Sequence, residues 1–167
     1  RPMTQHWFFG AAIQALEFLR RDFGYGPPHV DDHLPNLATV TFVGAVAVQA
    51  RLEPREEYLS LEVLPLVDGA MPTTAPIVHI PVGIIVQMLS PEAATEFQNR
   101  PRPDHLNGPI LLSAMAEALR AYASGLLRGD MAVVEDIRQY LHTSMAATPG
   151  VPGVDWWAED ASTSERV

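Results

Sequence analysis

The chain has 167 residues, 47% of them hydrophobic, and its 20 acidic residues against 11 basic ones give a formal net charge of −9. A chain of this length can bury the core of one domain. An acidic chain is a poor match for a nucleic-acid backbone, which is bound through clustered basic residues. The absence of cysteine and lysine excludes disulfides, zinc–thiolate sites and a Schiff-base lysine. We therefore expect no nucleic-acid partner and no cofactor.

Two apolar stretches, residues 37–50 and 75–89, are shorter than the roughly 20 residues of a membrane-spanning helix. The N-terminus has no signal-peptide pattern. We expect no membrane association and a cytoplasmic location. All basic residues are arginines and 15 residues are prolines, a composition typical of a GC-rich bacterial genome.

Residues 5–23 are predicted to form a helix, because apolar residues such as Phe9, Ile13 and Leu16 recur at steps of three and four. Gly24 follows directly, at the place where a left-handed residue ends many helices.

Residues 38–52 alternate between apolar and polar side chains, which predicts one half-buried antiparallel strand or two short ones hinged at Gly44. Residues 58–67 show the same alternation after a charged turn and are predicted to be the returning strand. Residues 25–36, which precede the first of these strands and contain three prolines, are expected to be a loop with at most a short edge strand around Val30. Residues 77–80 could add another short strand.

The second half of the chain is predicted to be mainly helical. Short helices are expected at residues 81–89 and 91–98, and a long one at residues 109–128. The apolar stripe of this long helix consists of Ile110, Ala114, Met115, Ala118, Leu119, Tyr122 and Leu126. A further helix begins after Gly129, and the tight turn between the two long helices predicts an antiparallel helical hairpin.

Strands followed by helices indicate an α+β fold. We predict an antiparallel meander of about three strands, packed against an N-terminal helix and a C-terminal helical hairpin. This single domain is expected to span residues 1–142. Residues 143–167 are expected to be an acidic tail that contains proline and glycine.

One cluster has the side chains that a divalent metal prefers. His29, Asp31 and His33 would share one face of an extended segment, and imidazole and carboxylate groups are common metal ligands. The alternative is a solvated polar loop, because charged clusters between prolines are usually exposed.

Three other residues are candidates for a ligand pocket between sheet and helices. His79 lies in an apolar run, where burial would make it a core residue or a tuned titratable group. Tyr58 and Arg51 are the other polar candidates. Glu53 and Glu62 lie on strands that are expected to pair, so either could form a cross-strand ion pair with Arg51.

The tail carries two adjacent tryptophans, Trp156 and Trp157, which follow Asp155. Exposed tryptophan is a frequent interface anchor, so these residues are candidates for partner binding. The alternatives are docking of the tail onto its own domain and a contact with a second copy.

Residues 18–24 on the first helix, Tyr122-Ala123, and residues 126–130 at the helical turn resemble those of small actinobacterial α+β proteins, some of which are immunity proteins encoded near toxins. The resemblance implies an acidic helper protein without catalysis. It transfers no catalytic or binding residue.

Three functions are compatible with these patterns. The first is a non-catalytic protein-interaction domain, immunity-like or chaperone-like, in which negative charge steers the chain to a basic partner. The second is a small-ligand-binding protein or an enzyme. The third is a homodimeric assembly protein that associates through a sheet edge or the helical hairpin.

Overall fold

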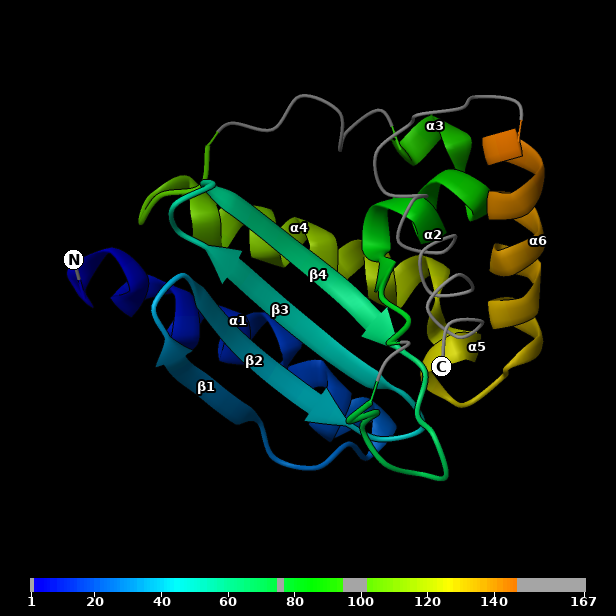
Figure 1. Ribbon diagram of the computed structural model, residues 1–167, viewed down its shortest axis with the longest axis horizontal. Helices are drawn as coiled ribbons and strands as arrows, with labels where there is room; N and C mark the ends of the chain where they lie inside the picture. Colours follow the sequence, from blue (N-terminus) through cyan, green and yellow to red (C-terminus); the bar gives the residue numbers. More distant parts are fainter. Residues whose placement is uncertain (1, 75–76, 95–101, 147–167) are drawn as a thin grey trace.

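A five-stranded antiparallel sheet forms the centre of the molecule (Figure 1). Its strands follow one another in sequence order: β1 (His29–Leu34), β2 (Leu37–Val43), β3 (Ala47–Glu53), β4 (Tyr58–Leu64) and β5 (Ile80–Pro81). The computed structural model describes residues 2–74, 77–94 and 102–146. The predicted α+β class and antiparallel meander are confirmed, but the sheet has five strands where about three were expected.

The two additional strands lie at the edges of the sheet. β1 pairs with β2 through His29 opposite Thr41, and a bulge interrupts the register beyond Asp31. The edge strand that the sequence allowed around Val30 is present and spans six residues, because Pro28 precedes the strand and Pro35 lies in the turn after it. Neither proline removes a donor from the ladder, and an edge strand tolerates nearby prolines.

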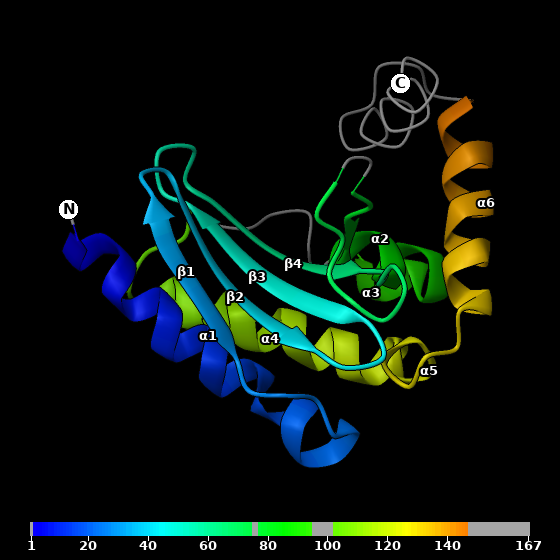
Figure 2. The same cartoon turned by 60° about the horizontal axis from the view of Figure 1, so that its bottom comes forward.

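Helices α1 (Pro2–Phe23) and α4 (Asn107–Tyr122) lie along the same face of the sheet (Figure 2). The alternation of the strands sends one set of side chains toward these helices, and that set is apolar. The largest fully buried side chains of this core include Phe8, Leu16 and Leu19 of α1, Phe42 and Leu61 of the sheet, and Leu112 and Leu119 of α4.

Helix α1 ends in the left-handed C-terminal cap that the sequence predicts at Gly24. Gly24 has φ +72° and its N–H donates to the carbonyl of Arg20, which is a left-handed helix cap. The chain then places Tyr25 in the interior, where it is 5% exposed and its hydroxyl donates to the carbonyl of Leu127 at 2.9 Å. The end of the first helix is therefore joined to a segment about one hundred residues later in the chain.

The remaining helices differ in part from the prediction. They are α2 (Val82–Leu89), α3 (Pro91–Ala94), α5 (Ser124–Leu127) and α6 (Ala132–Ala146). The long helix expected at residues 109–128 is interrupted at Ala123, which leaves the helical conformation with φ −126° and ψ 22°.

A second change of direction follows at Gly129, which has φ +97°. As a result α6 stands crosswise to α4 and packs against α2 (Figure 1). The two long helices therefore do not form the predicted antiparallel hairpin. α6 continues to Ala146, beyond the domain end expected at residue 142. Within the described part of the chain, no helix is long and apolar enough to cross a membrane.

The buried stripe of α4 also differs from the predicted one. Met115 and Leu119 are buried as expected, but Ile110 is 69% exposed and Tyr122 is 39% exposed. Leu112, which was not assigned to the stripe, is fully buried. The helix carries apolar residues on more than one side, so periodicity alone did not show which side faces the sheet.

Replacing Ile110 with serine is expected to change the free energy of unfolding by no more than about 0.5 kcal/mol, because the side chain is mostly in solvent. Urea denaturation of the variant and the parent chain measures this difference. A loss of about 2–5 kcal/mol, the usual cost of truncating a core residue, would show that Ile110 is buried after all.

Candidate functional site

The face of the sheet that lies away from α1 and α4 (Figure 2) carries polar side chains at its centre, as the strand register shows. The strand register places these side chains in two adjacent rows across the strands. One row contains Asp31, Thr39, Arg51 and Ser60, and the other contains His29, Thr41, Gln49 and Glu62. We call the set of Thr39, Thr41, Gln49, Arg51, Ser60, Glu62 and His79 the polar sheet face.

Glu62 is the central residue of the polar sheet face. It is 8% exposed, and its Oε1 lies 2.8 Å from Nδ1 of His79 and 3.9 Å from Nε of Arg51. β5 brings the histidine to this position, because Pro81 pairs with Glu62 and His79 lies just before the strand. A buried carboxylate needs such partners, since removing its charge from water is costly.

The neighbours of Glu62 are polar and mostly buried. Nε2 of Gln49 donates to Oγ1 of Thr41 at 2.9 Å. Arg51 also lies 4.0 Å from a carboxylate oxygen of Glu53. Ser60, which pairs with Arg51 across the strands, is 4% exposed and its Oγ has no hydrogen-bond partner among the described residues. A buried hydroxyl without a partner is uncommon in folded proteins.

The structure brings two of the three predicted ligand-binding residues to the same carboxylate. Arg51 and His79 both approach Glu62, while Tyr58 lies at the end of the same face and is 47% exposed. The cross-strand approach of Arg51 to Glu62 was anticipated from the sequence. The pairing of Glu62 with His79 was missed, because only the return of the chain as β5 brings them together.

The metal candidates lie on the exposed edge strand β1. Nδ1 of His33 lies 2.5 Å from Oδ1 of Asp31, and His29 is exposed at the start of the strand. Among residues 2–74, 77–94 and 102–146, no group of three or more histidine or acidic side chains is placed to hold a metal ion. The proposed partner-binding residues Trp156, Trp157 and Asp155 lie outside the described residues, so that assignment stays a prediction.

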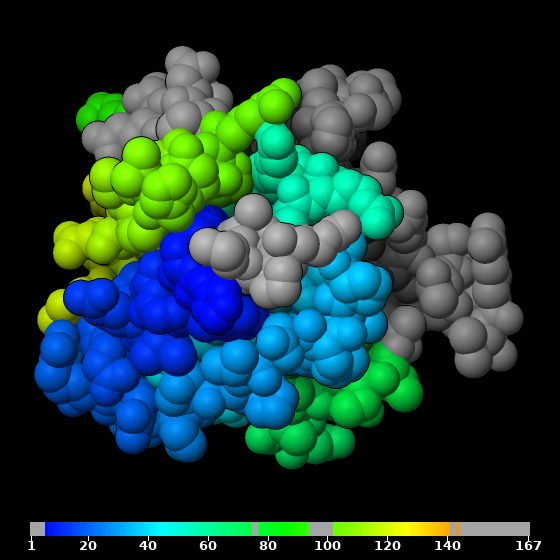
Figure 3. Space-filling view, turned by 90° about the vertical axis from the view of Figure 1, so that its left-hand side faces the viewer, coloured from blue at the N-terminus to red at the C-terminus, as the bar shows by residue number. Residues whose placement is uncertain are grey.

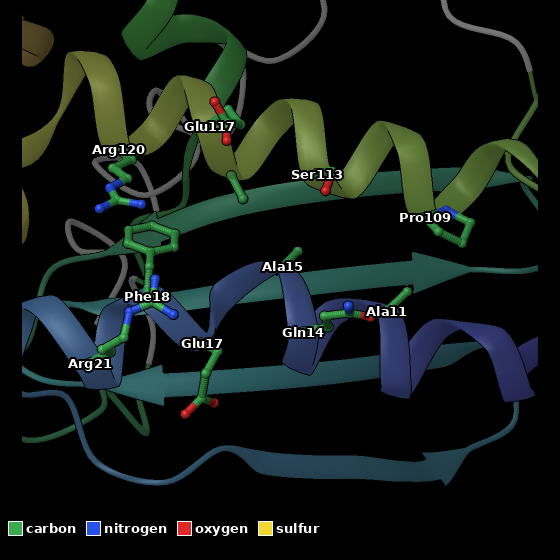
Figure 4. A pocket seen from close by; sticks show the side chains of 11 residues that line it. Ala11, Gln14, Ala15, Glu17, Phe18, Arg21, Pro109, Ser113, Glu117 and Arg120 are labelled. Carbon is green, nitrogen blue, oxygen red and sulfur yellow. The ribbon is translucent and has the colours of Figure 1, made fainter.

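A groove of about 380 Å³ runs between α1 and α4 on the outer side of the helical layer (Figure 4). At one end Nη2 of Arg120 donates to Asp22 at 2.8 Å, and its guanidinium lies 5.5 Å from the ring centre of Phe18. These contacts join the two helices. The groove is therefore explained by the packing of α4 against α1.

A second cavity, of about 640 Å³, lies at the end of the molecule where α1 begins. The start of α1, the β3–β4 turn and the segment before α4 meet on this side (Figure 3). Arg51, Tyr58 and His79 line neither this cavity nor the groove between the helices. The polar sheet face is thus separate from both.

No family model, curated protein or solved structure matches this chain. Its function is therefore inferred from the polar sheet face itself.

Proposed function

We propose that this chain is a protein-interaction domain and that the polar sheet face, together with Tyr58, is its contact site. The observation that carries the proposal is the placement of the buried Glu62 between Arg51 and His79, whose side chains are partly exposed, on the side of the sheet opposite α1 and α4. A buried ionic group contributes little to stability when compared with apolar residues of similar size. Its presence here is better explained by recognition of a partner.

The composition of this face favours a protein as the partner. Arginine and tyrosine are enriched among the residues that dominate binding energy at protein interfaces. Tyr58 is 47% exposed, so it is suited to contact a second surface. The net charge of −9 would accelerate association with a basic protein. An immunity-like or chaperone-like helper fits this mode of action.

The test is site-specific cross-linking in cells of the natural source. A photoreactive phenylalanine derivative replaces Tyr58 in one variant and Tyr122 in a second. Both tyrosines are partly exposed, at 47% and 39%, but Tyr122 belongs to α4 on the opposite side of the sheet. We expect a discrete cross-linked protein from position 58 only, identified by mass spectrometry.

Arg51→Gln is expected to reduce this product about tenfold or more, because a central interface arginine commonly contributes over 1.4 kcal/mol. The matched control is Arg20→Gln on α1, which removes an exposed arginine near Glu17 and should leave the product unchanged. Circular dichroism verifies that both variants are folded. Three outcomes would contradict the proposal. They are equal amounts of cross-linked product from positions 58 and 122, no cross-linked product from position 58, and a cross-linked product made only of two copies of the chain.

A further inference from the structure

The cavity beside the start of α1 is mainly apolar in its walls. Trp7 of α1, Leu52 of β3, Pro54 of the β3–β4 turn and Pro103 of the segment before α4 all line it. Its volume of about 640 Å³ lies within the range of roughly 300–1,000 Å³ that is usual for small-molecule sites. Such a cavity suits the apolar body of a small organic molecule.

A fixed carboxylate also lines the cavity. Oδ1 of Asp104 accepts hydrogen bonds from the backbone N–H groups of Leu106 and Asn107, each at 2.8 Å. These bonds, chiefly the one from Asn107, hold the pKa of Asp104 below its usual value. The carboxylate already occupies the positive end of α4, which would otherwise attract an anion.

The other acidic side chain of the lining is already neutralised by a neighbour. Oε2 of Glu57 lies 2.9 Å from Nη1 of Arg102, so this ion pair connects the β3–β4 turn to the segment before α4. Within the described parts of the chain, no arginine forms an ion pair with Asp104. Asp104 is therefore the carboxylate of the lining that no arginine of the described residues neutralises, and the imidazoles of His6 and His105 line the same cavity.

We propose that this cavity binds a small organic cation, an amine with an aromatic or alkyl body, whose ammonium group contacts Asp104 and whose body packs against Trp7. A cation near an indole ring is attracted to the face of the ring in addition to the carboxylate. The site is independent of the polar sheet face, since no residue is shared between them.

The experiment titrates the full chain with three probes of nearly equal shape, and isothermal calorimetry or saturation-transfer NMR measures the affinities. The probes are phenethylamine, which is cationic, 2-phenylethanol, which is neutral, and 3-phenylpropionate, which is anionic. We expect phenethylamine to bind about two- to fivefold more tightly than the other two, which corresponds to the usual effect of one exposed charge pair.

Asp104→Asn is the decisive variant, because asparagine accepts the same backbone hydrogen bonds as aspartate at the start of a helix but carries no charge. We expect it to lower the affinity for phenethylamine about two- to fivefold and to leave the weak binding of 2-phenylethanol unchanged. Asp31→Asn, on the distant strand β1, is the matched control and should have no effect.

A second variant tests the wall of the cavity. The Cβ added by Gly108→Ala would collide with the ring of Trp7, so the ring must move and the affinity for every probe should fall. Three results would overturn the proposal. They are tight binding of 3-phenylpropionate, an affinity of Asp104→Asn for phenethylamine equal to that of the parent chain, and affinities of Gly108→Ala for all three probes equal to those of the parent chain. Arg51→Gln should leave amine binding intact, so failure of this site and failure of the sheet-face proposal are distinguishable.

Discussion

Replacing Gly44 with alanine is expected to lower the free energy of unfolding by about 2–3 kcal/mol, at the upper end of the usual cost of overpacking. The added Cβ would lie 2.5 Å from Cδ1 of the Tyr25 ring. This ring cannot swing aside easily, because its hydroxyl is bound to the carbonyl of Leu127 and the next residue, Gly26, donates to the carbonyl of Val43. Urea denaturation monitored by circular dichroism measures the loss.

Gly10→Ala is the matched control. Nothing lies within 4 Å of a Cβ at this position of α1, so the substitution should raise stability by up to about 1 kcal/mol through helix propensity. The effect of Gly44→Ala should largely disappear when Tyr25 is replaced by alanine, since the clashing ring is then absent. An undiminished effect in that background would refute the steric explanation.

Between pH 10 and pH 12 the folded state is expected to lose about 2–3 kcal/mol through ionisation of Tyr25 alone. Burial raises the pKa of Tyr25 from 10.0 to about 12, and a backbone hydrogen bond from Val46 opposes this rise only in part. The phenol is therefore protonated in the folded chain at a pH where it ionises in the unfolded chain. This contribution is fully present below pH 10 and is lost as the pH approaches the folded-state pKa.

The measurement compares the parent chain with Tyr25→Phe at a series of pH values from 8 to 12. At pH 8 the phenylalanine variant should be about 1–2 kcal/mol less stable, because the buried carbonyl of Leu127 loses its donor. The difference between the two chains should vanish or change sign by pH 12, because only the parent loses about 2–3 kcal/mol through Tyr25 and the other titrating groups affect both chains equally. Parallel curves across this range would show that Tyr25 does not have a raised pKa.

The central strands could be predicted from the sequence because their alternation is a local property. The polar and apolar positions around Phe42 and Leu61 follow directly from a period of two. The break at Ala123 and the course of α6 could not be predicted in this way. They depend on contacts such as the hydrogen bond from Tyr25 to Leu127, which joins segments that are distant in sequence.

The candidate sites were predictable only as separate residues. Arg51 and His79 were identified individually, but their common partner Glu62 emerges from the register of β3, β4 and β5 together. The cavity beside Trp7 had no local signal, because Asp104 reaches it from a segment almost one hundred residues later. A single sequence shows which side chains are unusual, while the topology determines which of them meet.

The sequential order of the five strands has a consequence for the kinetics of folding. Each strand pairs with its neighbour along the chain, so most of the sheet forms by closing short loops at a small entropic cost. Docking of α4 onto α1 brings together parts that are far apart in sequence, and such non-local contacts slow folding. The hairpins from β2 to β4 are therefore expected to assemble early, and closure of the helical layer to limit the rate.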